Sequence, residues 1–273
     1  MGLALVVGCG LMAFGPSMML CVLVVGRRPA LVIIAVVSSF FWLASMALAS
    51  ILWTMIPATQ YLWILTMITG VLVQGFGRVA LARVYMKVEK AINEAPSAGG
   101  GSVGVRDSRS DDDSTARAEG DAAESLRQLQ EAPLKLNGIS SSLAAGVGWG
   151  AIHSIVILGT ALSKHMGPGA AFSQSCPGMP SVLVSALSAL PFVVLDLVLM
   201  TAAFAAVRSG DSTLLRCTFG LHFLAALTTG LNFVENGCEV SLPLLFGVTG
   251  VSTILFRISR RFRTALTRLR LGR

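Results

Sequence analysis

Charged side chains are scarce in this 273-residue sequence: they make up 13% of it, whereas hydrophobic residues make up 54% and the mean hydropathy is +0.74. A soluble domain usually has about 25% charged residues, and such a domain could not bury this much apolar surface. The net charge of +7 does not indicate nucleic-acid binding, because the bases stand at the ends of long apolar runs, as membrane-edge anchors do. We therefore expect a membrane protein.

The sequence patterns of several enzymes and metal sites are also missing. The five cysteines lack the spacing of a zinc site, no Asn-x-Ser/Thr sequon occurs, and no serine has a Gly-x-Ser-x-Gly setting. Intramembrane aspartyl proteolysis needs two aspartates that share a site, and Asp196 is the single aspartate within an apolar run. We expect no catalytic residues of its own, no metal and no cofactor.

What the sequence does contain is a series of apolar runs near the length of about 20 residues that a membrane-spanning helix needs. They predict an all-α, polytopic membrane bundle of seven helices, although arginines interrupt the third run and small residues dilute the fourth, so an even number stays open. The runs cover residues 2–25, 30–56, 61–84, 136–162, 180–207, 214–234 and 240–256.

The bases orient this bundle. With Arg27 and Arg28 in the cytoplasm, the N-terminus is extracytoplasmic and the C-terminus cytoplasmic, and Lys164 is the single base in the extracytoplasmic connections. The positive-inside rule favours this arrangement and the odd number of helices. The tail, residues 258–273, is expected to be a basic cytoplasmic segment that contacts anionic lipids.

A polar segment separates the two halves of the bundle, residues 1–90 with helices one to three and residues 134–257 with helices four to seven. This linker, residues 91–133, holds nine of the fourteen acids and four of the twenty-one bases, so its net charge is −5 and that of the rest is +12. Its polarity and small residues cannot support a core, so we expect a disordered, acidic cytoplasmic linker.

Two cysteines fall in the predicted extracytoplasmic loops. Cys176 lies between spans four and five, and Cys238 lies between spans six and seven. Because that compartment permits disulfides, a bond between them is one possibility and two free thiols the other.

Polar residues within the spans are expensive in hydrocarbon and need partners. Asp196 and His222 lie at depths that differ by about one helical turn on sequential spans, so they could pair directly, either as simple glue between two helices or around a polar cavity. Arg78 and Arg83 are expected to snorkel to the headgroups, with a polar contact between helices as the alternative for Arg78. Gln74 is expected to bond a neighbouring helix. His153 is expected to be an interfacial or bundle-facing histidine.

Small residues recur on one face of the fourth span. Ser142, Gly146 and Gly150 stand at four-residue intervals, which predicts a surface on which another helix packs closely. The spacing leaves open whether that helix belongs to this chain or to another.

Several stretches together resemble the anterior-pharynx-defective family, the seven-span scaffold subunit of γ-secretase. Residues 14–16 (FGP), preceded by Gly8, Cys9 and Ala13, are similar to its opening helix, and residues 40–53 (FFWLASMALASILW) to its second. Further along the chain, five more features are similar to the family: the polar pattern that closes its third span (Gln74, Arg78 and Arg83), its triple-glycine motif (Ser142, Gly146 and Gly150), the loop that follows (residues 167–169), its sixth-span histidine (His222), and the Leu-Asn pair that closes that span (Leu231 and Asn232).

The resemblance implies a non-catalytic scaffold that binds presenilin, nicastrin and the presenilin-enhancer subunit, and that supports presenilin-dependent cleavage of membrane proteins, including Notch-type receptors. It implies a multi-pass protein of the endoplasmic reticulum, Golgi, plasma membrane and endosomes. The sequence departs from the family where Ser142 replaces a glycine, where Asp196 replaces a histidine, and in its longer linker. A stand-alone transporter or receptor is the alternative.

Overall fold

The bundle is built almost entirely from helices, as the computed structural model of the chain shows for residues 3–94, 138–164 and 172–271. Seven of these helices are long and apolar enough to cross a membrane, which confirms the predicted all-α, seven-span bundle. They are α1 (Leu3–Leu20) continued by a π-helical turn (Cys21–Val25), α2 (Pro29–Met55), α4 (Trp63–Glu94), α6 (Gly138–Lys164), α7 (Ser181–Ser209), α8 (Ser212–Gly230) continued by a 3₁₀ turn (Leu231–Phe233), and α9 (Cys238–Leu271).

The chain divides into two compact units, one of Met1–Met86 with Gly138–Arg273 and one of Lys87–Asn137. Of the second unit the structure describes the last part of α4. The predicted disorder of the acidic linker falls largely outside the described residues, and so do the residues of the resemblance at 167–169.

Two helix ends differ from the predicted spans. The third span was predicted over 61–84, but α4 continues to Glu94 and is preceded by the short helix α3 (Ala58–Tyr61). The predicted tail after residue 257 continues α9 as far as Leu271. Charge ends an apolar run without ending a helix, because Lys, Arg and Glu are good helix formers and a helix can continue beyond the hydrocarbon boundary.

Helix α7 forms the centre of the bundle. Val193, Leu195 and Met200 are fully buried on it, and so is Asp196. By contrast α1 and α2 expose many large apolar side chains, among them Leu11, Ile33 and Phe40, as helices in contact with lipid do. The Asp196 side chain on α7 therefore lies where lipid and water do not reach it.

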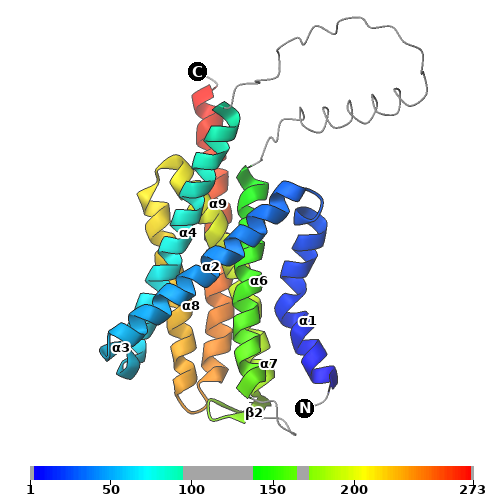
Figure 1. Cartoon of the computed structure of the whole chain (residues 1–273), viewed down its shortest axis with the longest axis vertical. Coiled ribbons are helices and arrows are strands. Elements are labelled where there is room, and N and C mark those ends of the chain that lie inside the picture. Colours follow the sequence, from blue (N-terminus) through cyan, green and yellow to red (C-terminus); the bar gives the residue numbers. More distant parts are fainter. Residues whose placement is uncertain (1–2, 95–137, 165–171, 272–273) are drawn as a thin grey trace, which may run out of the picture. The chain divides into compact units, whose positions relative to one another are not determined.

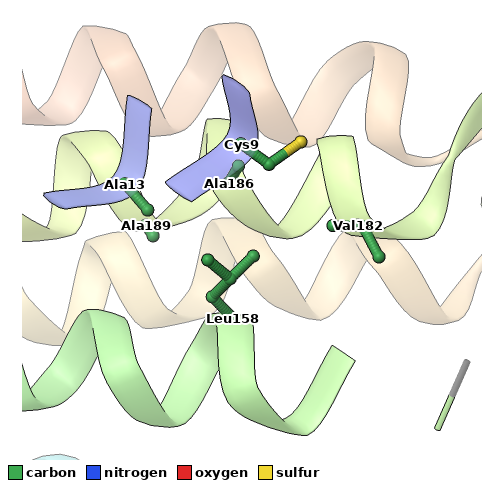
Figure 2. Packing of buried hydrophobic residues seen from close by; sticks show 6 residues of the cluster. All are labelled: Cys9, Ala13, Leu158, Val182, Ala186 and Ala189. Atoms are coloured by element: carbon green, nitrogen blue, oxygen red, sulfur yellow. The ribbon is translucent and has the colours of Figure 1, made fainter. Parts of the chain in front are cut away.

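Helix α1 packs on α7 and α6 through small side chains, as Figure 2 shows. Cys9 and Ala13, one turn apart on α1, lie against Ala186 and Ala189 of α7, with Leu158 of α6 beside them. Helices in lipid have little hydrophobic drive to associate, so they depend on such small residues for close packing.

Two connections at one end of the bundle are tied together. The antiparallel hairpin of β1 (Phe172–Ser173) and β2 (Cys176–Pro180) lies at the same end as α3 and the N-terminus (Figure 1). Cys176 of this hairpin forms a disulfide with Cys238, at the start of α9, with a Cα–Cα distance of 5.6 Å. The Cys238 amide also donates to the Ser175 carbonyl, at 3.1 Å.

This disulfide predicts the number of thiols that can be alkylated. When the chain is denatured in SDS without a reductant, we expect maleimide to label the three free cysteines, Cys9, Cys21 and Cys217. After reduction all five should react, as counted by mass spectrometry. Cys176→Ser is the matched control, since it should free Cys238 for labelling without a reductant. Labelling of five thiols in the unreduced wild-type chain would contradict the bond.

Candidate functional site

Arg78 is the centre of a buried polar cluster and does not reach the membrane surface. Its side chain, on α4, is 3% exposed. The snorkelling expected for Arg78 is therefore wrong, and the alternative, a polar contact between helices, is the arrangement found. Arg83 on the same helix is exposed. The difference has a physical cause: the bundle offers Arg78 an anion and an acceptor, so its charge is stabilised inside the protein.

The anion is Asp196. Its carboxylate on α7 is fully buried and pairs with Arg78 through Oδ1, while Oδ2 lies 2.8 Å from Nδ1 of His153 on α6. Since a carboxylate paired with a guanidinium can only accept, His153 Nδ1 is the donor in the second bond. A charge this deeply buried persists only when it is paired and hydrogen-bonded, and Asp196 has both kinds of partner.

The acceptor is His222. Its Nδ1, on α8, lies 2.9 Å from Nη1 of Arg78. The predicted direct pair of Asp196 and His222 is therefore not the arrangement found: both residues lie in one cluster, as their similar depths suggested, but Arg78 bridges them. A guanidinium binds two acceptors at once with its rigid fork of donors, so it takes the place between them.

Aromatic rings enclose this cluster. The Arg78 guanidinium carbon lies 4.9 Å from the ring centroid of Trp149, a distance that gives an attractive cation–π contact. The His153 ring lies between Trp42 and Phe192, with centroid distances of 5.4 and 5.1 Å. The rings exclude water from the ion pair and so strengthen it.

Gln74 lies one turn from Arg78 on α4 and is buried. Its amide nitrogen approaches Met46 Sδ on α2 at 3.2 Å, so Gln74 does contact a neighbouring helix. Its Oε1 atom is buried without a hydrogen-bond partner. Such an acceptor costs free energy unless a donor reaches it.

A cavity of about 440 Å³ adjoins the cluster. Gln74, His153 and His222 line it together with residues near the end of the bundle that carries α3, such as Trp63 and Phe233. Among the described residues no group of three or more His, Cys, Asp and Glu could hold a metal ion. The site therefore offers hydrogen bonds and aromatic walls.

The small-residue stripe of α6 packs within the chain. A Cβ atom on Gly146 would lie 2.9 Å from the Leu197 Cα, and one on Gly150 would lie 3.3 Å from the Val193 Cα. Both neighbours are backbone atoms of α7, so a Cβ atom on Gly146 would force the two helices apart, and one on Gly150 would make a tight contact. Ser142 is buried and donates its hydroxyl to the Ile139 carbonyl at 2.9 Å.

The model of the Aph-1 protein family matches residues 4–261. The chain belongs to the Aph-1 family. It is 27% identical over 252 residues to "Gamma-secretase subunit APH1-like" of Arabidopsis thaliana, covering 91% of this chain and 89% of that protein. It is 26% identical over 171 residues to human "Gamma-secretase subunit APH-1B", covering 59% of this chain and 53% of the human protein.

Its seven apolar helices and its membership of the Aph-1 family show that this chain is a multi-pass membrane protein. The sequence names His153 as an interfacial or bundle-facing side chain, and it does face the bundle, but no spacing links it to Asp196, forty-three residues away. The sequence does not single out Gly148, which stands off the four-residue stripe, yet a Cβ atom there would overlap the Ala35 carbonyl oxygen of α2.

Proposed function

We propose that this chain is a non-catalytic scaffold subunit of γ-secretase, needed for its assembly and for presenilin-dependent cleavage of membrane proteins, including Notch-type receptors. The observation that carries the proposal is the family match over residues 4–261, together with relatives in a plant, a mammal and an insect that are named gamma-secretase subunits. The partners would be presenilin, nicastrin and the presenilin-enhancer subunit.

The polar site favours a structural role over proteolysis. An aspartyl protease needs two carboxylates that share a proton, whereas Asp196 is paired with Arg78 and His153 instead. Within the described part of the chain, Asp196 is the single acid that is buried. A carboxylate engaged on both oxygens is suited to holding α4, α6 and α7 together, and the aspartates of presenilin would perform the cleavage.

The disulfide supports the predicted orientation. Its Cys176 belongs to β2, which lies at the end of the bundle that carries the N-terminus (Figure 1), and disulfides persist in oxidising compartments. An extracytoplasmic N-terminus and a cytoplasmic C-terminus agree with this, and so does residence in the endoplasmic reticulum, Golgi, plasma membrane and endosomes. Ser142, Gly146 and Gly150 would serve assembly through the shape of the α6–α7 pair.

Affinity purification from cells that express the tagged full chain tests the proposal. We expect presenilin-like and nicastrin-like proteins to co-purify in a mild detergent. Gly146→Leu should abolish their recovery, because its side chain would strike the α7 backbone at Leu197. Gly159→Leu is the matched control on α6, since a Cβ atom at Gly159 meets nothing within 4 Å. Recovery of the chain alone would overturn the scaffold role and favour a stand-alone transporter or receptor.

A further inference from the structure

The cavity beside the polar cluster has a polar base and an aromatic mouth. Gln74 lies eleven residues into α4, which begins at Trp63, so the base lies about 16 Å below the start of that helix. Trp63 and Phe233 also line the cavity, with ring centroids 5.6 Å apart, and both are exposed; we call their end of the cavity its mouth. A volume of about 440 Å³ falls within the range of small-molecule sites.

The hydrogen-bond chemistry at the base follows from Arg78. A guanidinium has no acceptor, so His222 Nδ1 accepts from it and the His222 ring is neutral, with its hydrogen on Nε2. No described residue is bonded to that Nε2 atom. His222 therefore presents an N–H donor among the groups that line the cavity.

The same base also presents acceptors. His153 donates from Nδ1 to Asp196, which in a neutral ring leaves Nε2 as an acceptor. The Gln74 Oε1 atom is a second acceptor. It has no hydrogen-bond partner, and Gln74 is more than nine-tenths buried. A group that both accepts and donates would satisfy this set, and a hydroxyl is the smallest one that an organic ligand can carry.

Charge and shape restrict the rest of the ligand. Of the described residues, those that line the cavity include no Asp, Glu, Lys or Arg, and the nearby charges of Arg78 and Asp196 offset each other. An ionic group would therefore lack a counter-charge from these residues. Trp53, Trp63, Met67 and Val71 supply mainly apolar walls. We propose that this cavity binds a membrane alcohol, a neutral and largely apolar molecule whose hydroxyl is bound between His222 and His153.

Photolabelling tests this proposal on the full chain in phosphatidylcholine nanodiscs. The probe is a photoreactive sterol with a free hydroxyl, and we expect saturable labelling of peptides that contain Trp53, Trp63 or Phe233. Unlabelled sterol should compete, and its methyl ether, which cannot donate, should compete about threefold to tenfold less well. Diacylglycerol, a second membrane alcohol, is compared as competitor, so that the better of the two identifies the source of the hydroxyl.

Two variants on α8 make the test decisive. Ala226→Leu fills the cavity without removing a partner of Arg78, and it should reduce saturable labelling at least fivefold. Leu227→Ala is the control, since Leu227 is 40% exposed on the outer face of the same helix, and it should label as the wild type does. Labelling that does not saturate, that is unchanged in Ala226→Leu, or that the ether competes equally well would overturn the proposal.

Discussion

Replacing Asp196 with Ala is expected to destabilise the chain by about 3–5 kcal/mol, the usual cost of removing one partner from a buried ion pair. Arg78, 3% exposed, would retain its charge with the His222 ring as its one remaining side-chain acceptor among the described residues, and His153 would lose the partner of Nδ1. The measurement is the midpoint of SDS-induced unfolding of the purified full chain, followed by tryptophan fluorescence.

A double replacement separates the effect of the ion pair on stability from the effect of the volume of its side chains. In Arg78→Met with Asp196→Leu both charges are gone, so no buried charge is left unpaired, and such replacements are often neutral or stabilising. We expect the double variant to be more stable than Arg78→Met alone or Asp196→Leu alone. Arg83→Met is the control for loss of a base from α4, since Arg83 is exposed. Simple additivity of the two single effects would show that Arg78 and Asp196 are not coupled.

The depth of each polar group could be predicted from the sequence, but the pairing could not. Counting residues from the helix ends placed Asp196 and His222 within about one turn of each other, and both belong to one cluster. Depth leaves the rotation of each helix about its axis undetermined, and rotation decides which side chains face inward. Arg78 therefore read as a surface anchor, although its helix turns it toward α7 and α8.

The seven spans were predictable for a different reason. Hydrophobic length is a property of the sequence alone, because the bilayer fixes the number of apolar residues that a helix needs. The ends of α4 and α9 lie beyond that constraint, and there the charged residues continue the helix to Glu94 and Leu271. The hydrocarbon core thus determines the number of helices, and local helix propensity determines their ends.

The structure also shows what surrounds Asp196, the position at which the sequence departs from the family that it resembles. Taken alone, an aspartate where the resemblance implies a histidine changes the charge of the site. In the bundle that aspartate accompanies Arg78, and His153 on α6 provides a second imidazole beside the cavity, together with His222. The bundle therefore neutralises the charge of Asp196 and holds two imidazole rings, those of His153 and His222, beside the cavity.

Close packing of α6 on α2 gives the second large effect, at Gly148. A Cβ atom there would overlap the Ala35 carbonyl oxygen and lie 2.7 Å from the carbonyl carbon. These are backbone atoms, so relief requires the two helices to separate. Separation would also weaken two hydrogen bonds from α2, from Ser38 to the Ala145 carbonyl at 2.6 Å and from Ser39 to the Gly148 carbonyl at 2.8 Å.

We therefore expect Gly148→Ala to cost about 2–6 kcal/mol, from overpacking of about 1–3 kcal/mol and two weakened hydrogen bonds of about 0.5–1.5 kcal/mol each. Gly159→Ala, on the same helix, adds the same methyl group into open space and should be neutral or slightly stabilising because alanine favours helix. The SDS midpoints of the two variants are compared directly. Equal midpoints would mean that α2 and α6 do not approach each other at Gly148, whereas a loss confined to Gly148→Ala would locate the tightest helix contact outside the four-residue stripe.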